Sequence, residues 1–265
     1  MTRVVSAVVL GALVIYIITA APPLLGVLAV FIAALAAAHE MAALLESAGS
    51  TVARVPAVAA SCLMVAGAWS GGLVGLSAGL AVGLTLIFTW MVLTGKVEGS
   101  VIRLSGGFLL LLYPVWSLAH VILYLDSGSG RRALLFLLLC VWICDSAAYY
   151  VGSTLGRRKL APEISPNKTI AGAVGGTLGA AGASVILKML NLIPWSIPFA
   201  LGAGLSIAVL AQVGDLAESM IKRDAGVKDS GSLIPGHGGI MDRVDALLFT
   251  IPVFYYILSI IGGSV

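Results

Sequence analysis

Long apolar runs, separated by short polar or glycine-rich stretches, make up most of this chain. Each run is long enough to cross a hydrocarbon core of roughly 30 Å as a helix. The runs cover residues 4–20, 22–44, 52–69, 73–94, 106–125, 132–152, 169–190, 195–220 and 241–261. This pattern predicts an all-α, polytopic membrane protein with about nine transmembrane helices. Gly71 and Gly72 predict a tight hairpin between the third run and the fourth.

Composition agrees with this prediction and adds an orientation. The 265 residues are 60% hydrophobic, and the mean hydropathy of +1.08 is more than a soluble domain needs. With the N-terminus in the cytoplasm, twelve of the 15 Lys and Arg residues fall on the cytoplasmic side, as the positive-inside rule requires. We therefore expect an integral protein of a prokaryotic plasma membrane, with its polar loops facing the cytoplasm.

The densest polar stretch covers residues 219–245, which we call the signature segment. Eight of its 27 residues are charged, against 10% of the whole chain. Charges between two membrane helices are costly to place, which favours a functional interpretation. The alternative is an ordinary cytoplasmic loop that carries positive-inside charges.

Carboxylates recur at helical spacing at both ends of the signature segment. Spacings of four and three place a carboxylate, a hydroxyl and an amine on one helical stripe, Asp215, Ser219 and Lys222. Asp242 and Asp245 likewise share a face at the start of the last run. If the two helix ends oppose each other, three carboxylates meet. Oxygen ligands favour Mg²⁺, Mn²⁺ or Ca²⁺ over zinc, and Lys and Arg residues beside them suit phosphate groups.

A second polar region lies between the sixth run and the seventh. Asp145, inside the sixth run, must be paired, protonated or directed at a polar cavity, or else it makes a structural hydrogen bond to another helix. Ser165 or Thr169 is expected to cap the seventh helix, whose N-terminus beside Lys168 suits an anion. The alternative is that the Lys and Arg residues of this loop only flank the membrane on its cytoplasmic side, as the positive-inside rule describes. By contrast, Glu40 near the end of the second run predicts an interface contact.

The residues alone therefore predict a metal-dependent phosphoryl or nucleotidyl transferase that acts on a lipid phosphate. The signature segment also resembles a motif of the phosphatidate cytidylyltransferases, the CDP-diacylglycerol synthases. That motif reads Ser-x-apolar-Lys-Arg, four residues, Lys-Asp-x-small, two residues, apolar-Pro-x-His-Gly-Gly-apolar-x-Asp-Arg-apolar-Asp, and every position is filled here. Residues 145–176 are similar to two further motifs of the family, Asp-x-x-Ala-Tyr and Ile-Ser-Pro-x-Lys-Thr-x-Glu-Gly. Ala171 stands where the family usually has Glu, which leaves the contribution of this loop open.

The resemblance implies transfer of a cytidylyl group from CTP to phosphatidate, with release of pyrophosphate. It also implies a need for Mg²⁺ with K⁺ as a second cation, a homodimer among membrane lipids, and no nucleic acid partner. The expected catalytic residues are Asp215, Ser219, Lys222, Arg223, Asp242, Arg243 and Asp245. The expected substrate-binding residues are Asp145, Ser165, Lys168, Thr169, Lys228, Asp229, His237, Gly238 and Gly239. The expected metal ligands are Asp215, Asp242 and Asp245.

The polar residues also suggest a division of the chain. Residues 1–95 are expected to form a scaffold, dimer or lipid-facing region, and residues 96–265 a catalytic domain. Other functions remain open. The same chemistry on another lipid phosphate, such as an archaeal ether lipid, fits equally well, and a CTP-using lipid kinase would release CDP instead. An ion-coupled transporter would use Asp145 and Asp215, but the charges gather at one face and no inverted repeat is visible.

Overall fold

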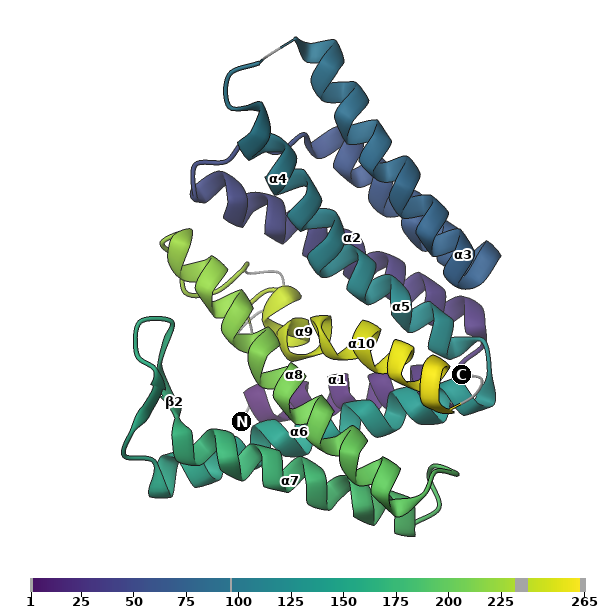
Figure 1. The fold of residues 1–265 in the computed structure, drawn as a ribbon, viewed down its shortest axis with the longest axis vertical. Helices are drawn as coiled ribbons and strands as arrows, with labels where there is room; N and C mark the ends of the chain where they lie inside the picture. The colour runs from purple at the N-terminus through teal and green to yellow at the C-terminus, as the bar shows by residue number, and fades with distance from the viewer. Residues whose placement is uncertain (1, 96, 232–237, 263–265) are drawn as a thin grey trace. The chain divides into compact units, whose positions relative to one another are not determined.

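The computed structural model describes residues 2–95, 97–231 and 238–262, and most of them are helical (Figure 1). Seven helical segments among these residues are long and apolar enough to cross a membrane. The prediction of an all-α, polytopic membrane protein is confirmed, whereas the count of nine helices stays a prediction. The chain forms two compact units. Unit 1 comprises Met1–Asp126 with Ile221–Val244, and unit 2 comprises Ser127–Met220 with Asp245–Val265.

Most of unit 1 is a group of apolar helices. Their bounds are α1 (Thr2–Thr19), α2 (Pro23–Ser47), α3 (Arg54–Thr94), α4 (Ser100–Leu110), η1 (Leu111–Val115) and α5 (Trp116–Leu125). Helices α2, α3 and α5 pack on one another. Leu111–Val115 is a π-helical turn around Pro114, where the wider turn accommodates a residue that has no N–H to donate.

Helix α3 reverses direction at Gly71 and Gly72, as the sequence predicted. Gly72 has a φ of 57°, in the left-handed region that glycine adopts without strain. The two arms of α3 then pack closely, because a Cβ at Gly79 would lie 2.8 Å from the carbonyl oxygen of Leu63. Glycine at this position therefore permits the backbone contact.

Unit 2 contains the remaining elements and a small strand pair. Their bounds are α6 (Gly128–Leu155), β1 (Lys159–Ala161), β2 (Ser165–Thr169), α7 (Ile170–Met189), α8 (Ile197–Asp224), α9 (Met241–Leu248), α10 (Thr250–Ile257) and η2 (Leu258–Gly262). Both α8 and α9 cross the division between the units. Helices α6 and α7 pack along each other. A Cβ at Gly172 would lie 2.7 Å from the carbonyl oxygen of Ala148, so glycine at this position permits the two helices to pack closely.

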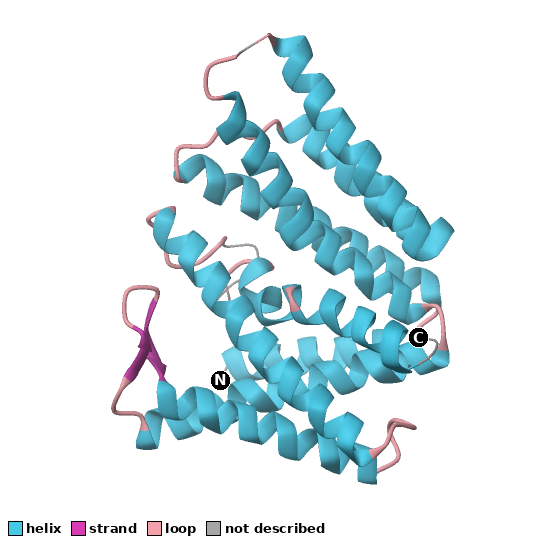
Figure 2. Ribbon diagram, in the orientation of Figure 1, coloured by secondary structure: helices cyan, strands magenta, loops and turns pink. Residues whose placement is uncertain are grey.

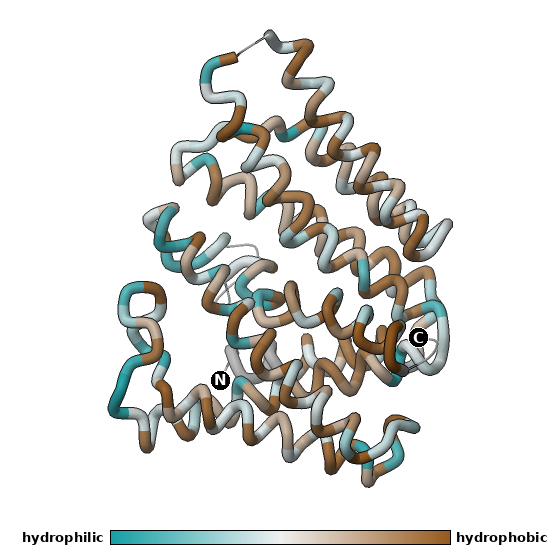
Figure 3. The backbone as a smooth tube through the Cα atoms, in the orientation of Figure 1, coloured by the Kyte–Doolittle hydropathy of each residue, from teal (hydrophilic) through white to brown (hydrophobic). Residues whose placement is uncertain are grey.

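The strand pair connects α6 to α7 and carries polar side chains. β1 and β2 are antiparallel, with Lys159 opposite Thr169, and Figure 2 shows them projecting beside α7. Hydrophilic residues gather on this hairpin and at the C-terminal end of α8, whereas the helices are mainly hydrophobic (Figure 3). The sequence predicted this segment as a loop, because strands of only three and five residues give a pattern too short to recognise.

Candidate functional site

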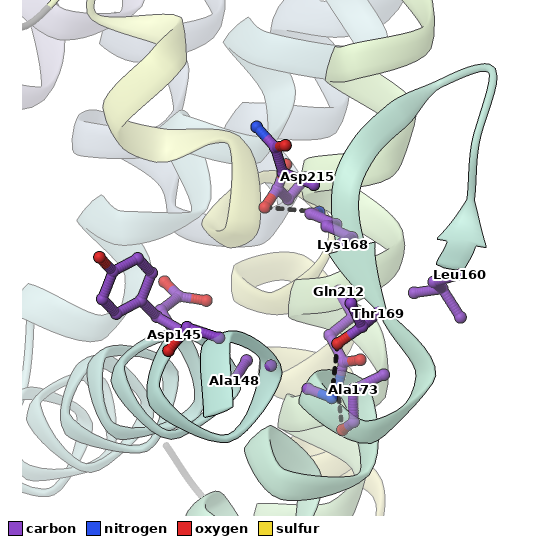
Figure 4. A pocket seen from close by; sticks show the side chains of 13 residues that line it. Asp145, Ala148, Leu160, Lys168, Thr169, Ala173, Gln212 and Asp215 are labelled. Carbon is purple, nitrogen blue, oxygen red and sulfur yellow. Dashed lines mark hydrogen bonds and ion pairs between the residues drawn. The ribbon is translucent and has the colours of Figure 1, made fainter. Parts of the chain in front are cut away.

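A pocket of about 470 Å³ lies within unit 2, between α6, the strand pair, α7 and α8 (Figure 4). Its lining includes four of the residues that the sequence singled out, Asp145, Lys168, Thr169 and Asp215. These residues come from separate elements, so only the folded chain brings them together. The pocket also includes Gln212, which the sequence did not suggest.

Lys168 and Asp215 form an ion pair in this pocket. The Lys168 Nζ lies 2.6 Å from Oδ2 of Asp215, and their side chains are 26% and 33% exposed. Ser219, one helical turn further along α8, donates a hydrogen bond of 3.4 Å to Oδ1 of Asp215. The ion pair thus leaves both charged groups accessible from the pocket.

Negative charge exceeds positive charge around Asp145. This residue is exposed on α6, and Figure 4 shows it on the pocket wall that faces Lys168 and Asp215. Two carboxylates, those of Asp145 and Asp215, and one ammonium group, that of Lys168, line this pocket among the described residues. Asp245 is near α8 as well, because a Cβ at Gly214 would lie 2.6 Å from the carbonyl oxygen of Asp245.

Two polar residues fix the elements around the pocket. Thr169 caps α7, because its hydroxyl accepts a hydrogen bond of 3.1 Å from the N–H of Gly172, which confirms one of the two caps that the sequence allowed. Gln212 on α8 donates its amide to the carbonyl oxygen of Ala173 at 3.3 Å and to the hydroxyl of Thr177 at 3.1 Å. A polar link of this kind between two apolar helices fixes their register.

The second part of the candidate site lies within unit 1, around Asp242. Its side chain is 9% exposed, and its Oδ1 lies 2.6 Å from the Nζ of Lys222. Its Oδ2 accepts hydrogen bonds from the N–H and hydroxyl of Ser230, both at 2.9 Å, and from the N–H of Gly239 at 2.8 Å. The protein itself therefore supplies four donors to this one carboxylate.

Glu40 reaches the same place from α2. It is 5% exposed, and its Oε1 and Oε2 accept hydrogen bonds of 2.9 Å from the N–H groups of Ile240 and Met241. Ser230 donates its hydroxyl to Oε2 of Glu40 at 3.1 Å. We call the side chains of Glu40, Lys222, Ser230 and Asp242, with the backbone of residues 239–241, the Glu40 cluster. The predicted interface contact of Glu40 is thus a contact with the signature segment, and its importance was missed.

The glycines of the signature segment leave room for these carboxylates. Gly238 has a φ of 77°, a backbone conformation that residues other than glycine rarely adopt. A Cβ at Gly239 would collide with Oγ of Ser230 and Oε2 of Glu40. The sequence analysis placed both glycines among the substrate-binding residues, whereas in this structure Gly239 makes a close approach to the protein's own side chains.

The other predicted site residues differ in exposure. The exposed residues among them are Arg223, Lys228, Asp229 and Arg243. Arg223 donates to the carbonyl oxygen of Val227 at 3.0 Å, just after α8 ends. Ser165 lies half-buried on β2, and Oδ1 of Asp245 accepts from the N–H of Ala246 at 2.7 Å. His237 lies outside the described residues.

The predicted metal ligands are divided between the two units. Asp215 and Asp245 belong to unit 2, and Asp242 belongs to unit 1. Within residues 2–95, 97–231 and 238–262, no three His, Cys, Asp or Glu side chains are placed to share a metal ion. The metal assignment therefore stays a prediction.

Comparisons with known proteins agree with the resemblance. A model of the cytidylyltransferase family matches residues 1–261. The uncharacterized protein YnbB of Escherichia coli K12 is 41% identical over 181 residues, which are 66% of this chain and 60% of YnbB. A phosphatidate cytidylyltransferase of Bacillus subtilis is 44% identical over 131 residues, which are 49% of each chain. One from Staphylococcus epidermidis is 37% identical over 155 residues, 58% of this chain and 60% of its own. The chain thus spans about half to three fifths of these relatives.

Proposed function

The chain belongs to the cytidylyltransferase family, and we propose that it transfers a cytidylyl group from CTP to phosphatidate. The products are CDP-diacylglycerol, a precursor in phospholipid synthesis, and pyrophosphate. The observation that carries this proposal is the unit 2 pocket, which combines Lys168, Asp215 and Asp145 on apolar helices. Relatives named phosphatidate cytidylyltransferase support the choice of substrate.

In the proposed reaction, a phosphate oxygen of phosphatidate attacks the α-phosphorus of CTP. The bond from that phosphorus to the oxygen that bridges to the β-phosphate breaks, and pyrophosphate leaves. No side chain acts as a nucleophile, because the lipid phosphate is already ionised near neutral pH. The protein's task is therefore to position both substrates and to stabilise charge.

Lys168 and the start of α7 are the groups that meet phosphate in this proposal. Asp215 holds the ammonium of Lys168 at 2.6 Å, so the cation is fixed before substrates arrive. Helix α7 is 20 residues long, and its capping residue Thr169 lines the pocket. The positive end of the helix dipole favours a phosphate there.

The donor chemistry of the pocket fits Mg²⁺. Its aspartates, Asp145 and Asp215, offer oxygen atoms only, and two carboxylates beside one pocket carry the kind of charge that a divalent cation neutralises. We propose that Asp215 and Asp245 hold this ion. When bound, Mg²⁺ would supply electrostatic stabilisation to the phosphate groups. Participation of Asp242, the use of K⁺ and a homodimer remain predictions.

We propose further that the protein lies in a prokaryotic plasma membrane with its active site facing the cytoplasm. The distribution of Lys and Arg residues supports this orientation. CTP would then arrive from the water and phosphatidate from the bilayer.

The test of this function is release of pyrophosphate by purified protein in detergent, with CTP, phosphatidate and Mg²⁺. We expect release to need all three components and to stop when EDTA removes the metal. Release of CDP instead would indicate a lipid kinase. Absence of any nucleotide turnover in folded protein would contradict the proposal.

A further inference from the structure

We infer that Glu40 is a positioning residue: from α2, its carboxylate fixes the start of α9 and thereby orients Asp242 against Lys222. This inference rests on the proposed function, and it adds a residue from the N-terminal half of the chain to the machinery of the reaction. Glu40 lies 190 to 201 positions away from its partners along the chain.

Glu40 contacts the N-terminus of α9. The first N–H groups of a helix have no partner within it. Here the N–H groups of Ile240 and Met241 each lie 2.9 Å from an oxygen of Glu40. A buried carboxylate at this end also meets the positive end of the helix dipole. Glu40 therefore caps a helix to which it is not adjacent in sequence.

The hydroxyl of Ser230 links Glu40 to Asp242. It lies 3.1 Å from Oε2 of Glu40 and 2.9 Å from Oδ2 of Asp242. A serine hydroxyl has one proton, so it donates to one of the two carboxylates at a time. Glu40 and Asp242 therefore compete for a shared donor, and a change at one alters the hydrogen bonding of the other.

The carboxylate of Glu40 has little space around it. A Cβ at Gly231 would lie 2.9 Å from its Oε1, and a Cβ at Gly239 would collide with its Oε2. The backbone of the signature segment thus encloses this carboxylate on two sides. A group enclosed by hydrogen bonds and close contacts permits little motion of α9, and Asp242 lies in the first turn of that helix.

The variant that tests this inference is Glu40→Gln, which keeps the shape of the side chain. Its NH₂ group would face an N–H of the signature segment, because all three partners of Glu40 are donors. We expect kcat for pyrophosphate release to fall by ~10- to 100-fold, as for other residues that orient a functional group. The KM for CTP should change little, whereas the thermal unfolding temperature should fall, because the NH₂ group and an N–H then face each other in a buried site.

Glu46→Gln is the matched control on the same helix. Glu46 pairs with Arg54 at 2.6 Å, and its side chain is 38% exposed, so its loss should leave kcat unchanged. The double variant Glu40→Gln with Ser230→Ala supplies a second readout. If both residues act through Asp242, the fold-decrease in kcat of the double variant will be smaller than the product of the two single-variant fold-decreases.

Hydrogen exchange separates failure of this inference from failure of the proposed function. In Glu40→Gln we expect faster amide exchange at residues 240 and 241, while the peptides of α6 and α7 exchange as in the wild type. A wild-type protein without pyrophosphate release would refute the proposed function, and exchange would still report on the cap. Unchanged exchange, or unchanged kcat in an active protein, would overturn the role of Glu40. An equal loss of protection everywhere would show that Glu40 serves only the fold.

Discussion

Asp215 and Asp242 are carboxylates of the same type with opposite surroundings. The Asp242 side chain is 9% exposed in the Glu40 cluster, and its four hydrogen-bond donors all come from the protein. The Asp215 side chain is 33% exposed in the unit 2 pocket and pairs with Lys168. The difference separates two tasks that the sequence placed on one set of aspartates. The signature segment, fixed by Glu40, holds Asp242 in one orientation, whereas Asp215 is accessible to a ligand.

The largest effect on turnover is expected at the accessible carboxylate. Asp215→Asn should reduce pyrophosphate release by ~10²- to 10³-fold, because it removes a preorganised charge and frees Lys168. The unfolding temperature should stay close to that of the wild type. Asp126→Asn, at an exposed residue, is the control and should retain full activity. Full activity in Asp215→Asn would remove the pocket from the reaction.

The enclosed carboxylate should dominate stability instead. Asp242→Asn removes the carboxylate that lies 2.6 Å from the buried ammonium group of Lys222, which is expected to cost ~3–5 kcal/mol in the free energy of unfolding. Adding Lys222→Met should recover part of this loss, since the buried ammonium group is then gone. Chemical denaturation in detergent measures both values. If Asp215→Asn were equally destabilising, the comparison between the two carboxylates would fail.

A smaller effect is expected from filling the space beside the Glu40 cluster. Gly239→Ala places a methyl group against Ser230 and Glu40, and such overpacking costs ~1–3 kcal/mol. The control is Gly202→Ala on α8, where a Cβ meets nothing within 4 Å. Ala at that helical position should add ~0.5–1 kcal/mol of stability. Equal effects of the two substitutions would contradict the tight enclosure of Glu40.

The smallest effect is expected at the cap beside the pocket. Thr169→Ala removes the hydroxyl that accepts from Gly172, at a cost of ~1 kcal/mol in stability. Thr169→Ser keeps the hydroxyl and should retain most of that stability. Thermal unfolding of the three proteins gives the order directly. A Ser variant as unstable as the Ala variant would show that the methyl group, and not the cap, is what matters.

Much of the fold could be predicted from the sequence, because apolar runs and glycine breaks are local signals. The hairpin at Gly71 and Gly72, the cap at Thr169 and the close packing of α7 on α6 all follow from residues near one another in the chain. The π-helical turn at Pro114 and the strands of the 159–169 hairpin were not predicted. Their patterns are too short to distinguish from a helix with a proline and from a loop.

The site was predicted only in part, because its contacts join distant residues. The sequence singled out Asp145, Lys168 and Asp215, and the fold brings them to one pocket. It gave no indication that Lys222 pairs with Asp242 or that Glu40 reaches residues 240 and 241. The signal that was available for Glu40 was a carboxylate within an apolar helix, which by itself calls for a buried partner. The predicted boundary between residues 95 and 96 stays a prediction.

The measurement that tests the central claim most directly follows the label of CTP through one turnover. Purified protein is supplied with phosphatidate, Mg²⁺ and CTP that carries radioactive phosphorus at the α or the γ position. The account predicts that the α label enters the extracted lipid while the γ label leaves in pyrophosphate, in equal amounts. Transfer of the γ label to lipid, or no transfer of either label by folded protein, would contradict it.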